Sequence, residues 1–504
     1  MIVPPRQLGH HTSFIVAVPM HSTEETPLVD RPARRFWSKL FPVAFATVIA
    51  VTMCSLLACS AIFPSSATTA TTIDLAVSFC DPTVKHEFGY IQLPHKVNDH
   101  YFYSYFESRN NPATDPLIVW LEGGPGASST WSIFNLNGPC SINDDLSGTT
   151  PNPYSWTNNA NVVWLDQPSG VGFSYGDATD DDHNQEDVGH NFYAFMQGFL
   201  QKHPELHTRP LFIMGESYGG HYVPAAAHYI LAQQQATTKS SDGIRINLKG
   251  IAIGNGLTDT VTQMPATVHM ARDNSYNISL VTPGEFLHMQ ADAERLRTKL
   301  VECQTSSPNA ARACLEAVQL WFVNIIGPMV TNPLRNDMDL RQVCSPTLGC
   351  GDFGGKTTEA FLNQVHTRTL MGVHKQAHFQ TNNDTTFNAF IVDMAKSYVR
   401  YVPTLLAAGV RVLLYVGDAD LVCDWQGNDA WAKQLEWDGK STYNAAAVTP
   451  LVVDGKTAGQ VRSSHGLSFV RVFDAGHFVP RYHPEVAVAL VDRFLHNAAL
   501  DQGQ

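Results

Sequence analysis

The chain has 504 residues, of which 44% are hydrophobic and only 16% are charged, so it can bury a large core and is not a disordered protein. Its formal net charge of −13 argues against nucleic acid as a partner, because phosphate binding needs a concentrated positive surface. The sequence shows no internal repeat, no metal-ligand cluster and no phosphate-binding Gly-Lys-Ser/Thr loop, and we expect neither a metal nor a cofactor.

The N-terminal region divides into three parts. Residues 1–39 are rich in Pro and charge and are expected to be disordered, whereas residues 40–63 carry no charge and are long enough to span a bilayer. Basic residues before this segment favour a cytosolic N-terminus and a luminal remainder. The segment is either a cleaved signal peptide or a retained signal anchor that attaches the protein to a membrane. Residues 64–73, rich in Ser, Thr and Ala, predict a linker.

The rest of the chain predicts an α/β fold with an insertion. Over residues 74–259 strand-like runs alternate with helical ones. These runs are Leu117–Leu121, Val162–Leu165, Leu211–Met214 and Leu248–Ile253. Residues 260–382 are helical and irregular and predict an inserted cap that restricts entry to a site. Residues 383–504 return to the first pattern. Their elements are expected as strands at 410–416 and 467–473 and a helix at 484–497.

The strand at 211–214 leads into Gly215-Glu216-Ser217-Tyr218-Gly219, and a helix-compatible segment follows. This order is typical of the nucleophile elbow of an α/β-hydrolase. The glycines are needed because the serine sits in a strained backbone conformation where strand and helix meet closely. The turn presents the serine oxygen above the sheet, where a histidine can accept its proton.

An acid and a histidine follow in the order that this fold uses. The strand at 410–416 is followed by Asp418 and Asp420, and the strand at 467–473 is followed by His477. Of the 21 histidines, His477 alone directly follows a strand and an Ala-Gly turn near the C-terminus. The residues predict a triad of Ser217, His477 and one of the two aspartates. Because both aspartates follow the same strand, their position does not show which of them is the triad acid.

Several ordered motifs resemble those of the serine carboxypeptidases, from about Phe79 to Phe494. They are Trp120-Leu121-Glu122-Gly123-Gly124-Pro125-Gly126-Ala127-Ser128-Ser129, Asn137-Gly138-Pro139, Asn152-Pro153-Tyr154-Ser155-Trp156, the segment 165–175, Gly215–Tyr222, Ile253-Gly254-Asn255-Gly256, Gly417-Asp418-x-Asp420-x-x-Cys423 and Ala475-Gly476-His477-x-Val479-Pro480. The resemblance implies an α/β-hydrolase fold, a mostly parallel sheet flanked by helices, with an inserted, mainly helical cap.

The resemblance also implies roles in acyl transfer. It makes Asp420 the triad acid and Gly124 one donor of the oxyanion hole, the other being the N–H of Tyr218, the residue after the nucleophile. Ser217 would attack the C-terminal peptide carbonyl, and His477 would act first as base and then as acid.

Recognition of the substrate carboxylate is where the chain departs from the family. By resemblance Glu122, Gly123 and Glu216 lie at this site, but Glu122 stands where Asn is usual and Leu136 where a second Glu is usual. A protonated carboxyl can donate a hydrogen bond to a carboxylate, and crowded carboxyls share protons, with one pKa raised. We therefore expect Glu122 and Glu216 to form an acid pair and activity to be favoured at acidic pH. The alternative is that Glu122 faces solvent at the rim of the loop.

The cysteines and two sequons fit a secretory route. The close pairs Cys303/Cys314 and Cys344/Cys350 are expected disulfides, the second with a spacing seen in relatives, and Cys80/Cys140 is a further candidate. By resemblance Cys423 is a free thiol near the active site. Asn277 and Asn383 begin the sequons Asn-Ile-Ser and Asn-Asp-Thr.

The leading interpretation is a serine-type carboxypeptidase that acts on peptides with a free C-terminus. The runner-up is an acyltransferase or esterase on the same scaffold, because a triad indicates acyl transfer and not a substrate. A protective or scaffolding role is the third. The family is mostly lysosomal, vacuolar or secreted, which favours cleavage of residues 40–63. A homodimer is left open by the sequence.

Overall fold

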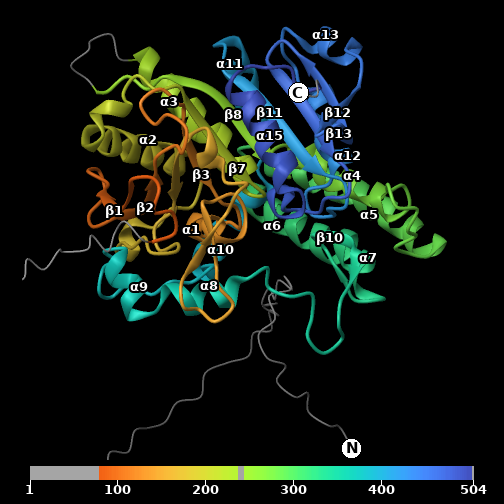
Figure 1. Cartoon of the computed structure of the whole chain (residues 1–504). Helices are drawn as coiled ribbons and strands as arrows, with labels where there is room; N and C mark the ends of the chain where they lie inside the picture. Colours follow the sequence, from red (N-terminus) through yellow and green to blue (C-terminus); the bar gives the residue numbers. More distant parts are fainter. Residues whose placement is uncertain (1–78, 237–242, 502–504) are drawn as a thin grey trace, which may run out of the picture. The chain divides into compact units, whose positions relative to one another are not determined.

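The computed structural model describes residues 79–236 and 243–501, and these contain a ten-stranded sheet in the order β1-β2-β6-β3-β7-β8-β11-β14-β13-β12 (Figure 1). The expected segments at residues 1–39, 40–63 and 64–73 lie outside the described residues. The strands are β1 (His86–Gln92), β2 (His100–Phe106), β3 (Leu117–Leu121), β6 (Asn161–Leu165), β7 (Leu211–Glu216), β8 (Leu248–Gly254), β11 (Arg411–Gly417), β12 (Thr449–Val453), β13 (Lys456–Ser464) and β14 (Leu467–Val472).

The middle of the sheet is parallel, and its edges are antiparallel. Strands β6, β3, β7, β8, β11 and β14 pair in parallel, whereas β1, β2, β12 and β13 add antiparallel ribbons at the two edges. Every residue of β3, β6 and β7 is buried, as expected for parallel strands covered on both faces. The fold is thus the predicted α/β-hydrolase type, whereas the edge strands were not among the elements expected from sequence.

Helices cover both faces of the sheet. Side chains of α2 (Gln185–Lys202), α3 (Gly219–Ala236), α11 (Val402–Ala407) and α12 (Trp425–Gln434) fill the core on one face. Side chains of α1 (Ser129–Asn135) and α15 (Pro484–Leu495) fill it on the other. Successive side chains of a strand point to opposite faces of the sheet and so enter different cores. In β3, Val119 and Leu121 belong to the first core, and Ile118 and Trp120 belong to the second.

The segment between β8 and β11 contributes no strand to the large sheet within the described residues. Besides α11, its α-helices are α4 (Thr260–Ala266), α5 (Pro283–Cys303), α6 (Ala310–Leu320), α7 (Gly327–Thr331), α8 (Gly355–Leu362), α9 (Val365–Leu370) and α10 (Asp384–Ala389). A small ribbon, β9 (Arg335–Asn336) with β10 (Asp339–Val343), lies among them, and a π-helical turn at Trp321–Ile326 joins α6 to α7. The limits 260 and 382 for the insertion remain a prediction.

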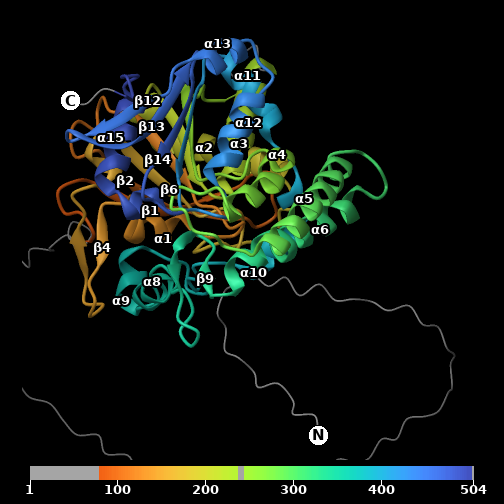
Figure 2. The ribbon, with the colours of Figure 1, turned by 90° about the vertical axis from the view of Figure 1, so that its right-hand side faces the viewer.

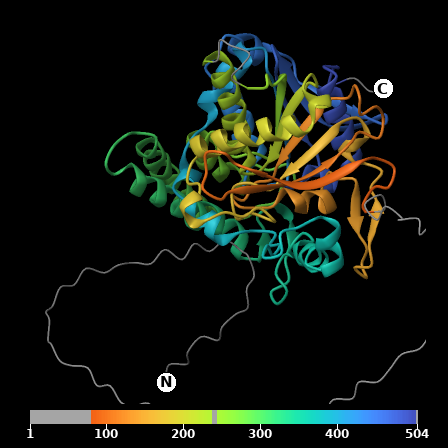
Figure 3. The same cartoon turned by 90° about the vertical axis from the view of Figure 1, so that its left-hand side faces the viewer.

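The α5–α6 hairpin extends away from the sheet, as the two side views show (Figures 2 and 3). A capping box at Thr282 and Glu285 with Pro283 starts α5, and the Cys303–Cys314 disulfide closes the hairpin. Within the described part of the chain, one helical stretch, Ala310–Thr331, is long and apolar enough to cross a membrane by length and composition, and 44% of its most apolar window is buried in the protein.

The described residues form three disulfides. They are Cys80–Cys140, Cys303–Cys314 and Cys344–Cys350, the pairs named from the sequence. Cys423 is free and buried. Such bridges fit an extracellular or luminal protein.

The remaining strands and α-helices are the ribbon β4 (Cys140–Ile142) with β5 (Thr149–Pro151) and the helices α13 (Lys440–Ala445) and α14 (Val479–Tyr482).

The order of the strands defines a place for a ligand. The chain leaves β3 toward β6 on one side, whereas it leaves β7 toward β8 on the other. Ligands of open α/β sheets bind at such a switch point, outside the carboxyl ends of the strands. The loops after β3 and β7 are those that begin with Glu122 and Ser217.

Candidate active site

Ser217 occupies a left-handed turn between β7 and α3. Its φ is +61°, a conformation that is strained for a residue with a side chain. A Cβ on Gly215 would lie 2.4 Å from the carbonyl oxygen of Leu121, and one on Gly220 would lie 2.5 Å from that of Leu257. Gly219 is less constrained, at 3.1 Å from its nearest neighbour. The elbow therefore forms where β3 and the segment after β8 approach it too closely for side chains.

Asp420 and His477 lie beyond the carboxyl ends of the adjacent strands β11 and β14. His477 Nδ1 lies 2.7 Å from Asp420 Oδ2, and both side chains are buried. Burial alone lowers the pKa of His477, but the Asp420 carboxylate outweighs it, with smaller contributions from Glu122 and Asp337, so the net shift is upward. The pair is therefore arranged to stabilise an imidazolium.

Three further donors hold the Asp420 carboxylate. Asn255 Nδ2 donates to Oδ2 at 2.8 Å, and the N–H groups of Val422 and Cys423 donate to Oδ1 and Oδ2 at 3.0 and 3.2 Å. Asn255 belongs to the motif Ile253-Gly254-Asn255-Gly256, but the sequence predicts no role for it. The signal that could have found it is its position directly after β8, beside the strand that carries Asp420.

Asp418 is engaged elsewhere. Its carboxylate forms an ion pair with Arg471 at 3.0 Å, accepts a hydrogen bond from the Tyr276 hydroxyl and another from the Asp474 N–H at 3.1 Å. Of the two aspartates, Asp420 and not Asp418 therefore contacts the histidine.

The glycine-rich loop after β3 lies against the nucleophile. A Cβ on Gly123 would lie 2.6 Å from Tyr218 N and 2.7 Å from Ser217 Cβ. Gly124 has a φ of +107°, which only glycine adopts readily, and a Cβ there would lie 2.6 Å from Ala127 N. The backbone of this loop and the Tyr218 N–H are therefore next to one another at the switch point.

Glu122 faces inward and is well supplied with donors. It is 3% exposed, and its carboxylate accepts hydrogen bonds from Ser132 Oγ at 2.5 Å, Gly123 N–H at 3.1 Å and Trp120 Nε1 at 3.2 Å. Burial nevertheless raises its pKa. The alternative that Glu122 faces solvent is wrong.

Glu216 has the opposite environment. It is fully buried, and neither carboxylate oxygen has a hydrogen-bond partner among the described residues. Burial, followed by the nearby charges of Glu122 and Asp420, raises its pKa well above the usual range. Leu136, at the end of α1, is buried and offers no polar group. The two glutamates thus lie together, one with three donors and one with none.

The segment between β8 and β11 reaches the proposed catalytic residues through the turn between β9 and β10. The His477 N–H donates to the Met338 carbonyl at 2.8 Å, and the Leu421 N–H donates to the Asp337 carbonyl at 3.0 Å.

Cys423 is 2% exposed, and burial raises the pKa of its thiol well above the usual range. Asp420, Cys423 and His477 form the one cluster of metal-type ligand atoms in the described residues, and two of them are the proposed acid and base.

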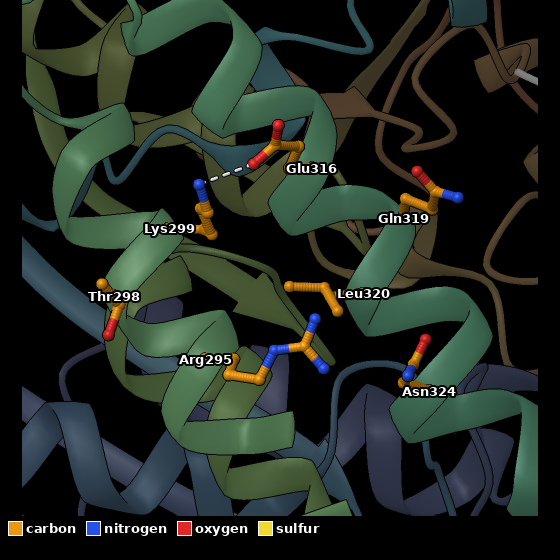
Figure 4. Close-up of a pocket in the computed structure, with 7 residues that line it drawn as sticks. All are labelled: Arg295, Thr298, Lys299, Glu316, Gln319, Leu320 and Asn324. Carbon is orange, nitrogen blue, oxygen red and sulfur yellow. Dashed lines mark ion pairs between the residues drawn. The ribbon is translucent and has the colours of Figure 1, made fainter. Parts of the chain in front are cut away.

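A separate surface cavity of about 460 Å³ lies on the α5–α6 hairpin (Figure 4). Its charged wall includes the Lys299–Glu316 ion pair at 2.6 Å. The lining residues are Arg295, Thr298, Lys299, Glu316, Gln319, Leu320 and Asn324. None of them is a candidate site residue.

Comparisons with known proteins agree with this geometry. The family model described as serine carboxypeptidase matches residues 78–497. Serine carboxypeptidase-like 49 of Arabidopsis thaliana is 36% identical over 424 residues, covering 83% of this chain and 79% of that protein. Carboxypeptidase Y homolog A of Arthroderma otae is 37% identical over 429 residues, covering 84% and 76%. The solved structure of the Saccharomyces cerevisiae prohormone-processing carboxypeptidase Kex1 superposes with a TM-score of 0.72 at 24% identity, covering 84% of this chain and 94% of that one, which supports the fold.

Asp424 is a buried carboxyl that follows the site directly. It is 1% exposed, its Oδ1 accepts the Gly427 N–H at 2.8 Å at the start of α12, and its Oδ2 lies 3.0 Å from Thr267 Oγ1. Burial raises the pKa of Asp424 to about 7, and the charge of Asp420 adds to this rise. An Asn at this position keeps the acceptor for Gly427 and supplies a donor for the threonine hydroxyl.

We expect Asp424→Asn to stabilise the protein at neutral pH. Because the folded pKa is about 7 against an ordinary 3.8, the stabilising contribution of the protonated carboxyl is complete below pH 3.8 and is lost as pH rises through 7. Keeping this group ionised above pH 7 costs on the order of 4 kcal/mol. Thermal unfolding from about pH 4 to 8 should show a steeper decline for the wild type than for the variant. Parallel pH profiles would contradict this assignment.

Proposed function

Because the chain belongs to the serine carboxypeptidase family and is a serine-type carboxypeptidase, we propose that it releases C-terminal residues from peptides through an acyl-enzyme on Ser217. The observation that supports these roles best is the arrangement of Ser217, Asp420 and His477 after parallel strands, with a 2.7 Å contact between histidine and aspartate. The order along the chain is that of an α/β-hydrolase triad.

In the first half of the reaction, Ser217 Oγ attacks the carbonyl carbon of the last peptide bond while His477 Nε2 takes the hydroxyl proton. The resulting oxyanion accepts hydrogen bonds from the N–H groups of Gly124 and Tyr218. His477 then gives its proton to the departing amine, which leaves as the free C-terminal residue. Asp420 holds the imidazole through Nδ1 and stabilises its charged form.

In the second half, water replaces the amine. His477 takes a proton from the water as its oxygen attacks the acyl carbon, the same donors hold the second oxyanion, and Ser217 leaves with the proton returned by His477. The shortened peptide departs with a new carboxylate. The raised pKa of His477 means that its base form is depleted as pH falls, which sets the acidic limit of activity.

Recognition of the substrate carboxylate is assigned to Glu216, Glu122 and Gly123. Glu216 is suited to be the protonated member of the pair, because its pKa is raised furthest and its oxygens have no other described partner. As a neutral acid it can donate a hydrogen bond to the substrate carboxylate. Glu122, which already accepts three hydrogen bonds, is suited to carry the negative charge of the pair.

One observation favours an acyltransferase or esterase as the second candidate. Leu136 stands where the family has a second Glu, so one carboxyl is absent from this site. The three donors near Glu122 already form hydrogen bonds with its carboxylate and are not free to bind a substrate carboxylate. An enzyme with weak carboxylate recognition would accept esters or other acyl donors on the same triad.

The proposed location is the secretory pathway, in a lysosome or vacuole or outside the cell. The three disulfides support a luminal catalytic part, and residues 40–63 would serve as signal peptide or anchor. Formation of a homodimer is a further proposal that rests on the family alone.

Replacing Ser217 by Ala tests the reaction. Purified wild type should release the last residue from N-blocked dipeptides, with peptide amides poor, and the variant should lose at least about 10⁴-fold in kcat. Release is measured by quantifying the free amino acid between about pH 4.5 and 7.5. Ester turnover without peptide release would instead favour the second candidate.

Replacing Glu216 by Gln tests carboxylate recognition. As pH rises through its elevated pKa, Glu216 ionises and repels the substrate, so the wild-type KM for peptides should rise about ten-fold or more toward neutral pH. Gln stays a neutral donor, and its KM should vary less with pH. Peptide amides, which carry no carboxylate, are the matched substrate control.

Replacing Glu122 by Asn is the companion variant. Removing the adjacent charge should make Glu216 ionise at lower pH, because a like charge holds its proton in place. The rise in KM should therefore move to lower pH. An unchanged KM and pH profile in both variants would contradict the assigned site.

The two sequons should differ in glycosylation. Asn277 is exposed, whereas Asn383 Nδ2 donates to the Gly170 carbonyl at 2.7 Å and its Oδ1 accepts the Thr385 N–H at 2.8 Å at the start of α10. We expect Asn277→Gln to remove the glycan from protein made in a eukaryotic secretory host, and Asn383→Gln to leave its mass unchanged apart from the substitution. Intact-mass spectrometry before and after glycosidase treatment measures this. Glycan on Asn383 would contradict the described hydrogen bonds.

A further inference from the structure

The residue after the nucleophile is fixed by its side chain as well as by its backbone. Tyr218 is 2% exposed, and its hydroxyl donates to Asp393 Oδ2 at 2.6 Å. Its ring stacks on His221, with centroids 4.3 Å apart, and meets Tyr222 edge-on at 5.0 Å. The side chain therefore has a defined position, and the hydroxyl bond is its one polar anchor among the described residues.

Asp393 is a buried carboxylate that the catalytic steps above do not use. It is 4% exposed and lies in a short 3₁₀ turn, Asp393–Ala395, between α10 and α11. Besides Tyr218, it accepts hydrogen bonds from the Tyr398 hydroxyl at 2.5 Å and from Gln185 Nε2 at 2.9 Å. Within the described residues no Lys or Arg forms an ion pair with it. Three neutral donors thus hold a charge that burial would otherwise make unfavourable.

The backbone of Tyr218 has little tolerance for movement. A Cβ at Gly123 would lie 2.6 Å from its nitrogen, and Ser217 on its N-terminal side is in the left-handed conformation. Its N–H must point at the oxyanion and not at the ground-state carbonyl, because donors in an oxyanion hole act only when they are aimed in advance. A rotation of the elbow is resisted on one side by the glycine loop and on the other by the phenol anchored at Asp393.

We propose that Asp393 is a positioning residue for the oxyanion hole, acting through the Tyr218 hydroxyl to keep the Tyr218 N–H aimed at the developing charge. The proposal rests on the oxyanion role proposed for Tyr218. It holds for any acyl substrate, so it does not require that the leaving group be an amino acid. Asp393 itself touches neither substrate nor the reacting atoms.

The chain offers a matched pair of variants. Tyr218→Phe and Tyr398→Phe each remove one phenol hydroxyl from the same carboxylate, but only the first belongs to the residue that carries the oxyanion donor. If the network positions the donor, Tyr218→Phe lowers kcat about ten-fold with KM changed less than about two-fold, and Tyr398→Phe leaves kcat near the wild-type value. Melting temperatures should fall by similar amounts in both.

A second readout separates positioning from general loosening. A peptide aldehyde forms a tetrahedral adduct with Ser217, and its affinity should fall by the same factor as kcat/KM in Tyr218→Phe. Binding of the free C-terminal amino acid, which places no oxyanion in the hole, should be unchanged. In Asp393→Asn the loss in kcat should not add to that of Tyr218→Phe in the double variant, since both break one interaction.

Equal losses of kcat in the two tyrosine variants, or an unchanged aldehyde affinity in Tyr218→Phe, would overturn the proposal. The assays are run with a peptide and with an activated ester. Wild-type ester turnover without peptide release refutes the proposed peptidase function and leaves the comparison of variants valid on the ester. Normal peptide release with indistinguishable variants refutes only the role of Asp393.

Discussion

The close approach of the β3 and β7 loops is the constraint on which the site depends. Gly123 has no room for a side chain, because the Tyr218 nitrogen and Ser217 Cβ lie only 2.6 and 2.7 Å from where its Cβ would be. The same approach brings the glycine loop to the proposed oxyanion hole beside Tyr218 and places Glu122 beside Glu216 at the ends of paired strands. A substitution that separated the two loops would affect nucleophile, oxyanion donors and acid pair together.

The charged groups that surround His477 are all acidic. The groups that act on His477 are the carboxyls of Asp420, Glu122 and Asp337, and all raise its pKa. Among the described residues no Lys or Arg forms an ion pair with Glu122, Glu216 or Asp337, and burial raises the pKa of all three, most strongly at Glu216. The carboxylate site proposed at Glu216 and Glu122 is therefore matched to acidic surroundings.

Local sequence patterns predicted the strands that precede the proposed catalytic side chains. Leu117–Leu121 was placed to the residue, and the strand expected at 410–416 is Arg411–Gly417, because buried parallel strands form apolar runs bounded by turns. The helix expected from 484 ends at Leu495 and not at 497. The antiparallel edge strands were missed, since β1 and β2 carry polar and aromatic residues without a long apolar run.

What the residues alone could not supply were contacts between distant segments. Asp418 and Asp420 follow the same strand, and they differ because Arg471 of β14 pairs with the first. The inward orientation of Glu122 depends on Ser132 in α1. Asp393 lies in an irregular segment with no periodic signal, and its importance becomes visible only when Tyr218, 175 residues earlier, is found beside it.

Asn255 joins the two ends of the long insertion. Its N–H donates to the Tyr415 carbonyl at 3.0 Å, and its side-chain oxygen accepts the Gly417 N–H at 2.9 Å, so the departure from β8 is tied to the return along β11. Since β8 and β11 are neighbours in the sheet, the segment 256–410 leaves and rejoins the sheet at adjacent strands, and its backbone forms a closed loop between them. Closure entropy rises only slowly with the length of such a loop. The length of the exposed parts of the insertion can therefore change at little cost in closure entropy, whereas α11, Met338 and Asp393 are held in place by their contacts with the core and the site.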